Sequence, residues 1–262
     1  MKIGVFDSGV GGLTVLRALL ERIPSADYLY LGDTARLPYG AKSRATVARY
    51  AASSARFLVA QGAEFLVIAC NTASALALDV IRDAVPVPVL GVVETGANAA
   101  QASSATRDVL VVATAATVES HAYLLACEQR NLRALEKACP LLVPLVEEGW
   151  IEHPVTSEVL RIYMSELMTQ AVDSALNPDT LVLGCTHYPL LRAQIERAVP
   201  MRWRVIDSAA VTAEQVAGML EASGGAGKTQ FFATDSVTKF RALGSRFLGR
   251  PIDGVDLVDL GG

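Results

Sequence analysis

Two cysteines occupy matching positions in the sequence. Cys70 follows the apolar run Phe65–Ala69, and Cys185 follows the similar run Thr180–Gly184. After each cysteine come hydrogen-bonding residues and then a helical pattern. A helix N-terminus stabilises anions and lowers the pKa of a thiol, so each cysteine is placed to act as a base. If the two segments face each other, one thiol can take a proton from one face of a carbon while the other returns a proton to the opposite face. That is the chemistry of a racemase without a cofactor.

Two further polar residues are placed to assist these thiols. Asp7 ends the first apolar run and belongs to the same half of the chain as Cys70, whereas His187 follows Cys185 by two residues. A carboxylate and an imidazole can each tune the protonation of a nearby thiol. Simpler roles stay open for both: Asp7 as the N-cap of the following helix, and His187 as a buried histidine with satisfied hydrogen bonds.

Two glycine-rich segments match nucleotide-binding loops only in part. Gly9-x-Gly11 follows a strand-like run but lacks the third glycine of a dinucleotide fingerprint, so a turn that brings the backbone close to a small anion fits it equally well. Residues 222–229 approach a phosphate-binding loop, but a helical pattern precedes them and a strand-like run follows, which reverses the required order. We therefore expect a surface connection there.

Metal and pyridoxal chemistry find little support. No pair of cysteines or histidines has the spacing of a zinc finger, and Cys185-x-His187 alone is only weak evidence for a metal site. Lys42 is the one lysine near a predicted cleft, and we interpret it as a solvated residue at a helix start. We expect neither a metal nor a cofactor.

The composition limits the class of protein. The chain has 262 residues, 52% of them hydrophobic and 19% charged, which indicates one or two folded domains and excludes extensive disorder. The formal net charge of −4 argues against a basic nucleic-acid groove. We see neither a signal peptide nor a spanning segment, so we expect a cytoplasmic protein whose four cysteines are free thiols.

Short apolar runs alternate with helical patterns along the whole chain, which is typical of an α/β fold with parallel sheets. The expected strands are Lys2–Phe6, Tyr28–Leu31, Phe65–Ala69, Pro88–Val93, Asp108–Ala113, Leu181–Gly184, Arg204–Ile206 and Gln230–Ala233. The apolar segments 108–118 and 140–146 both have the composition of buried strands. The stretch 118–139 reads as helical and carries Cys127 and Cys139, which we interpret as structural.

The sequence also contains a weak internal repeat. Besides the two cysteine segments, Ile3–Ser8 resembles Leu110–Ala115, and the two pairs occur in the same order at similar spacing. This repetition predicts two similar, pseudo-symmetric α/β halves. In parallel sheets, sites form where the strands end, so the site is expected in the cleft between the halves.

Five blocks together resemble one known family. DSGVGGLTV (7–15), GDTARLPYG (32–40), ACNTAS (69–74), PLVEEG (144–149) and GCTHYPLL (184–191) look like glutamate racemase and occur in that family's order over almost the whole chain. The resemblance implies cofactor-independent interconversion of L- and D-glutamate, which supplies D-glutamate for bacterial peptidoglycan. It also implies two similar domains with the site between them. We place the first domain at 1–93 plus 207–262 and the second at 94–206.

The resemblance assigns roles to individual residues. It implies that Cys70 takes the α-proton from D-glutamate and Cys185 from L-glutamate, that Asp7 and His187 assist them, and that Glu147 is an acid near the second thiol. The implied substrate contacts are Asp7, Ser8, Tyr39, Gly40, Asn71, Thr72, Thr114, Thr117, Thr186 and His187.

The resemblance also bears on partners. It leads us to expect a homodimer whose partner in the reaction is a small molecule, with no nucleic acid or membrane involved. The sequence starts directly at the first strand, so we do not expect the N-terminal extension through which some members are activated by a cell-wall precursor.

Two other functions remain open at this point. Relatives that racemise aspartate or another acidic compound share the two-cysteine plan, so the chemistry is better supported than the substrate. A non-catalytic binding protein on the same fold is the alternative of a different class, and the presence of Asp7, Cys70, Cys185 and His187 together argues against it.

Overall fold

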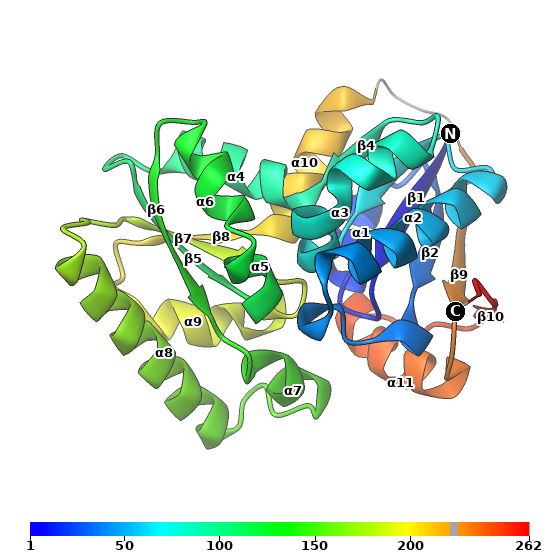
Figure 1. Cartoon of the computed structure of the whole chain (residues 1–262). Helices are drawn as coiled ribbons and strands as arrows, with labels where there is room; N and C mark the ends of the chain where they lie inside the picture. The colour runs from blue at the N-terminus through cyan, green and yellow to red at the C-terminus, as the bar shows by residue number, and fades with distance from the viewer. Residues whose placement is uncertain (221–224, 262) are drawn as a thin grey trace.

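The apolar runs form two separate sheets, which a computed structural model describes for residues 1–220 and 225–261 (Figure 1). The first sheet has six strands in the order β10-β9-β2-β1-β3-β4, and the second has four in the order β6-β5-β7-β8. All the paired strands run parallel. The first sheet lies on the right of Figure 1, where both marked chain ends are found, and the second lies on the left.

The strands of the first sheet are β1 (Lys2–Asp7), β2 (Asp27–Gly32), β3 (Phe65–Ile68), β4 (Val89–Gly91), β9 (Thr229–Ala233) and β10 (Asp256–Leu257). Those of the second are β5 (Asp108–Ala113), β6 (Arg133–Ala138), β7 (Thr180–Gly184) and β8 (Arg204–Asp207). The α-helices are α1 (Leu13–Arg22), α2 (Arg44–Ala60), α3 (Asn71–Ala84), α4 (Val92–Ser103), α5 (Ala115–Glu119), α6 (Ala122–Glu128), α7 (Leu142–Glu147), α8 (Pro154–Asp173), α9 (Arg192–Ala198), α10 (Ser208–Met219) and α11 (Val237–Leu248). Three short 3₁₀ helices are η1 (Thr34–Arg36), η2 (Tyr39–Ala41) and η3 (Tyr188–Leu191).

The two sheets repeat one topology, which confirms the prediction of two similar halves. The order β2-β1-β3-β4 in the first sheet corresponds to β6-β5-β7-β8 in the second. The segments paired by the internal repeat occupy equivalent strands, because β1 matches β5 and β3 matches β7. Cys70 therefore follows β3, and Cys185 follows the equivalent strand β7. The repeated topology gives the two thiols equivalent positions in their halves.

Two helices connect the halves. α4 follows β4 of the first sheet but packs on β7 and β8 of the second, while α10 follows β8 of the second sheet and packs mainly on α1 of the first. Where α4 and α10 contact each other, the buried hydroxyls of Thr95 and Thr212 are 2.6 Å apart. Figure 1 shows α10 lying between the two halves. The proposed domain limits, 1–93 plus 207–262 and 94–206, place every strand in the half to which its sheet belongs, except that Asp207, the last residue of β8, falls on the other side. These limits remain our proposal.

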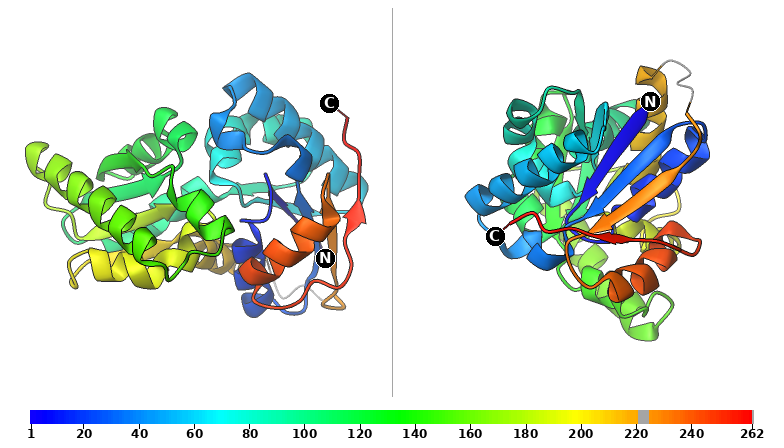
Figure 2. Two further views of the ribbon diagram at one scale, coloured as in Figure 1. Left: turned by 90° about the horizontal axis from the view of Figure 1, so that it is seen from below. Right: turned by 90° about the vertical axis from the view of Figure 1, so that its right-hand side faces the viewer.

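Apolar packing continues from one half to the other. A single cluster of buried side chains includes Val5 and Leu16 of the first half, Val216 of α10 and Leu183 of the second half. A second cluster lies on the other face of the first sheet and contains Cys70. Figure 2 shows from two further directions that helices cover both faces of the first sheet. Burial on both faces explains why these strands are continuous apolar runs.

Three expectations about local structure are wrong in whole or in part. Residues 133–138 form β6 although Ala, Leu, Glu and Lys favour a helix, because the segment pairs along its length with β5. The run 140–146 is not a strand but mostly α7, whose first turn accommodates Pro144. The strand expected at Pro88–Val93 ends at Gly91, and Val92 begins α4.

Other expectations are met in part. The segment 108–118 is a strand only to Ala113, after which α5 begins. Of the loop expected at 222–229, residues 222–224 lie outside the described part of the chain, and Thr229 begins β9. Within the described ranges, no helix is long and apolar enough to cross a membrane.

Candidate active site

Cys70 lies at the junction of β3 and α3, where it serves as the N-cap of the helix. Its sulfur accepts the backbone N–H of Ala73 at 3.4 Å, and its thiol donates to Ser8 Oγ at 3.4 Å. Burial, followed by the charge of Asp7, raises the pKa of Cys70 to about 12, although the contacts with Ser8 and Ala73 act in the opposite direction. Cys70 is therefore a protonated thiol at neutral pH.

Cys185 has a different environment in the other half. It is 5% exposed, like Cys70, but it is followed by the 3₁₀ helix η3 and not by an α-helix. Its partner is His187, whose Nε2 lies 3.1 Å from Glu147 Oε1. Burial alone would lower the pKa of His187, but hydrogen bonds with Cys185 and Glu147 raise it to about 10. His187 is thus an imidazolium at neutral pH and places a positive charge beside Cys185.

Asp7 connects the two environments. Its Oδ2 accepts the N–H of Gly9 at 2.8 Å, while Oδ1 is buried without a hydrogen-bond partner among the described residues. Burial raises the pKa of Asp7, and the charge of His187 in the other half is the main influence that lowers it. The N-cap of α1 is Gly12, so Asp7 does not have the simpler role of capping that helix. A buried carboxylate oxygen without a partner is costly unless a ligand supplies a donor.

Three threonine hydroxyls form a triangle between the halves. Thr72 at the start of α3 lies 3.1 Å from Thr114 and 3.4 Å from Thr117, which are themselves 3.0 Å apart at the start of α5. Next to Thr72, Asn71 accepts a hydrogen bond from Tyr123 through Oδ1, whereas its Nδ2 is buried without a partner in the described structure. These groups supply donors close to Cys70.

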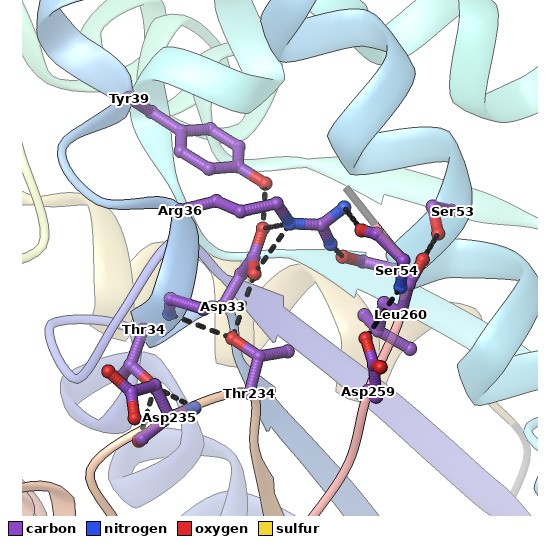
Figure 3. A network of polar contacts seen from close by, with 12 residues as sticks. Asp33, Thr34, Arg36, Tyr39, Ser53, Ser54, Thr234, Asp235, Asp259 and Leu260 are labelled. Atoms are coloured by element: carbon purple, nitrogen blue, oxygen red, sulfur yellow. Dashed lines mark hydrogen bonds and ion pairs between the residues drawn. The ribbon is translucent and has the colours of Figure 1, made fainter.

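The remaining predicted contacts fall into two groups. Thr186 lies at the junction of the halves, where its carbonyl accepts Thr14 Oγ1 at 3.0 Å and its hydroxyl lies 3.4 Å from His187 Nδ1. Gly40 faces the other half: a Cβ placed on Gly40 would lie 3.7 Å from the Cβ of Thr114. The Tyr39 side chain does not reach into the site with its hydroxyl, which instead donates to Asp33 (Figure 3).

The glycine-rich loop after β1 allows the two halves to approach each other closely at Gly11. A Cβ on Gly11 would overlap the Thr186 hydroxyl and lie 2.6 Å from the His187 ring. In addition, Phe247 of α11 packs edge-on against His187, with ring centroids 4.9 Å apart. Sequence reasoning missed Phe247 and Tyr123, because no motif connects them to the cysteines, and it assigned no role to Asp33 although this residue lies in the block GDTARLPYG.

The other two cysteines stay outside the site. Cys127 in α6 and Cys139 after β6 are fully buried free thiols. Cys139 and Cys185 follow strands that lie on opposite sides of β5, about two strand spacings or ~10 Å apart, which is too far for a disulfide.

Comparison with known proteins identifies the family. Residues 3–216 match the family described as Asp/Glu/Hydantoin racemase. The chain belongs to this family. It is 52% identical to the glutamate racemase of Koribacter versatilis, over 99% of this chain and 98% of that protein.

Two solved structures are similar over nearly their whole length. A glutamate racemase from Francisella tularensis, crystallised with D-glutamate, has a TM-score of 0.88 at 34% identity and covers 99% of this chain and 97% of its own. One from Thermus thermophilus, in complex with beta-chloro-D-alanine, has a TM-score of 0.85 at 44% identity, with coverage of 99% and 97%. The chain is accordingly an amino-acid racemase, an isomerase.

The close contact at Gly11 gives a first prediction. Gly11→Ala should reduce racemisation about 100-fold or more, because the added methyl displaces Thr186 and His187 from the first half. Gly218→Ala in α10 is the matched control, since a Cβ there meets nothing within 4 Å. Steady-state rates of the two purified variants check this, and equal activity in both would contradict it.

The His187 environment gives a second prediction. Because its pKa rises from 6.5 to about 10, the stability contributed by its proton is complete below pH 6.5 and is lost as pH rises through about 10. Nitrogen-15 NMR should show a protonated His187 ring at pH 8, and Glu147→Gln should move its titration to lower pH. The chain has only three histidines, so the signals of the His187 ring can be assigned readily. A neutral His187 ring at pH 8 in the unsubstituted protein would contradict the assignment.

Proposed function

We propose that this enzyme interconverts L- and D-glutamate, with Cys70 and Cys185 as the two acid/base groups. The main support is the arrangement of the two cysteines. Two buried thiols follow equivalent strands of two similar halves, and each has a different polar neighbour that can adjust its protonation. The similarity to glutamate racemases over almost the whole chain supports glutamate as the substrate.

A protonated Cys70 and a positively charged His187 suit attack on L-glutamate. In this direction Cys185, as the thiolate beside the His187 imidazolium, removes the α-proton, and the Cys70 thiol delivers its own proton to the opposite face. The products are D-glutamate, a Cys185 thiol and a Cys70 thiolate. The reverse reaction begins from those states, and Asp7 is the group that accepts a proton near Cys70.

The unpaired polar atoms suit the groups that every amino acid carries. The free Asp7 Oδ1 is a buried acceptor for the substrate ammonium, and Asn71 Nδ2 is a buried donor for a carboxylate. Thr72 lies at the N-terminus of α3, where backbone N–H groups and the helix dipole favour an anion. The carbanionic transition state gathers negative charge at that carboxylate, so these donors stabilise it more strongly than the ground state.

The halves must separate for glutamate to enter. Asp7, Cys70, Cys185 and His187 are all less than 10% exposed, and three surface hollows along β9, α1 and α11 are lined by neither cysteine. Opening breaks the Thr72–Thr114 and Thr14–Thr186 contacts, and closure restores them around the substrate. Excluding water in the closed state strengthens the electrostatic contacts on the reacting carbon.

The wider roles follow from the family resemblance. D-glutamate made by this enzyme would serve peptidoglycan synthesis in the cytoplasm, and a homodimer remains our expectation for its assembly. Aspartate is the substrate to compare, and faster loss of optical rotation with L-aspartate than with L-glutamate would replace the proposed substrate.

Removal of either thiol gives a third prediction. Cys70→Ala and Cys185→Ala should each lower kcat for racemisation by at least about 10²–10⁴-fold while leaving the fold intact, because each thiol serves one face of the carbon. Cys127→Ala is the control, a fully buried thiol outside the site, and it should keep its activity. Circular dichroism follows both folding and inversion, and near-normal turnover in either site variant would exclude the two-base reaction.

Solvent isotope incorporation gives a fourth prediction. In D₂O the product enantiomer should carry deuterium at the α-carbon, because the proton it receives comes from a thiol that exchanges with solvent. Mass spectrometry of the separated enantiomers measures this directly. Product that keeps the original α-hydrogen would show that one group carries the proton across.

A further inference from the structure

Asp33 is a fully buried carboxylate that lies outside the reacting groups. It directly follows β2, and its backbone N–H donates to the carbonyl of Asp7 at 3.0 Å. Its side chain is 0% exposed and accepts hydrogen bonds from the side chains of Arg36, Tyr39 and Thr234 (Figure 3). A buried charge that is so fully paired holds its partners in one geometry, because any movement leaves the carboxylate without donors.

Arg36 links this carboxylate to a distant segment of the chain. Its Nε bonds both Asp33 oxygens, at 2.9 and 2.8 Å, while its two terminal nitrogens lie 3.4 Å from Ser54 Oγ and from the carbonyl of Gly261. The guanidinium also lies over the Tyr50 ring, 4.5 Å from its centroid. The Arg36 guanidinium is therefore held on several sides. A lysine ammonium could not make all of these contacts, because it lacks the planar, forked arrangement of donors.

Residues 258–261, which we call the strap, are held across the edge of the first half. The Val258 N–H donates to the carbonyl of Ala233, and the carbonyl of Leu260 accepts Ser53 Oγ at 3.3 Å. Val258 and Leu260 also pack on the apolar cluster that contains Tyr39 and Cys70. The strap thus contacts Arg36 with its backbone and the core beneath it with side chains.

The Tyr39 ring transmits this anchoring to the site. The ring lies against Phe6 and Tyr50, with centroids 6.2 and 6.1 Å away, and its hydroxyl is held by Asp33. The next residue is Gly40, which faces Thr114 of the other half. The position of the Tyr39–Ala41 turn therefore depends on Asp33, and through it on Arg36.

We propose that Arg36 and the strap are positioning elements that set the Tyr39–Ala41 turn against Thr114 and so determine substrate affinity. This inference rests on the proposed function, because it assumes that the turn borders the substrate. The hydrogen bonds of Arg36 and the strap go to Asp33, Ser53, Ser54 and Ala233 or join the two to each other, and none of these bonds involves a thiol. Their loss loosens a contact made equally with the bound substrate and the transition state, which raises KM and changes kcat little.

The test compares two arginines with the same local chemistry. Arg36→Lys keeps the positive charge beside Asp33 but loses the fork that also contacts Ser54 and Gly261. Arg161→Lys is the matched control, because Arg161 likewise pairs through two contacts with a carboxylate three residues earlier, Glu158, but is exposed on α8. We expect Arg36→Lys to raise KM for glutamate about tenfold with kcat within about threefold, and Arg161→Lys to change neither.

A second variant acts on the strap alone. Val258→Pro removes the N–H that bonds Ala233 and leaves every partner of Asp33 in place. Val258→Pro should also raise KM for glutamate. If Arg36→Lys does not fold, the KM of Val258→Pro alone tests the proposal. An unchanged KM in the folded variants, even with a lower melting temperature, would show a merely structural role and overturn the proposal. A lowered kcat at constant KM would overturn it as well. If the unsubstituted enzyme does not racemise glutamate, the proposed function fails instead, so the two failures are distinguishable.

Discussion

The structure depends on burying opposite charges from its two halves in the same small volume. Asp7 of the first half and His187 of the second are each less than 10% exposed, and the charge of His187 opposes the effect of burial on the Asp7 carboxyl. A buried ionised group is costly without a partner. The positive charge of His187 therefore offsets part of the cost of burying the Asp7 carboxylate where the two halves meet. The close approach at Gly11, where a side chain would overlap Thr186, is the steric condition for that pairing.

A repeated topology supplies equivalent positions, and different neighbours make the two thiols unequal. Cys70 is capped by the start of α3 and lies near a carboxylate, so its pKa is raised to about 12. Cys185 lies beside His187, whose pKa is raised to about 10 by hydrogen bonds with Cys185 and with Glu147 of α7. A two-base reaction needs one thiol and one thiolate at the start of each turnover. The two thiols therefore have different polar neighbours before any substrate arrives.

Much of this arrangement could be predicted from sequence, because it depends on local pattern. The strands preceding Cys70 and Cys185 were placed nearly to the residue, and the internal repeat predicted two similar halves, which the shared strand order confirms. What could not be predicted depends on tertiary partners. Residues 133–138 favour a helix by composition and become β6 because β5 supplies hydrogen bonds, and the apolar run before Glu147 became a helix. Only the family resemblance associated Glu147 with the second thiol. Nothing in the sequence linked Asp33 to residues 258–261, since hydrogen bonds between distant segments leave no periodic signal.

If Cys70 acts on D-glutamate and Cys185 on L-glutamate, removing one thiol should leave proton exchange at the α-carbon of only one enantiomer. Cys185→Ala and Cys70→Ala would each be incubated with pure D- and L-glutamate in D₂O while proton NMR follows the α-hydrogen. We expect Cys185→Ala to exchange the α-hydrogen of D-glutamate alone and Cys70→Ala to exchange that of L-glutamate alone, both without inversion. Exchange of the same enantiomer by both variants, or the opposite assignment, would contradict it.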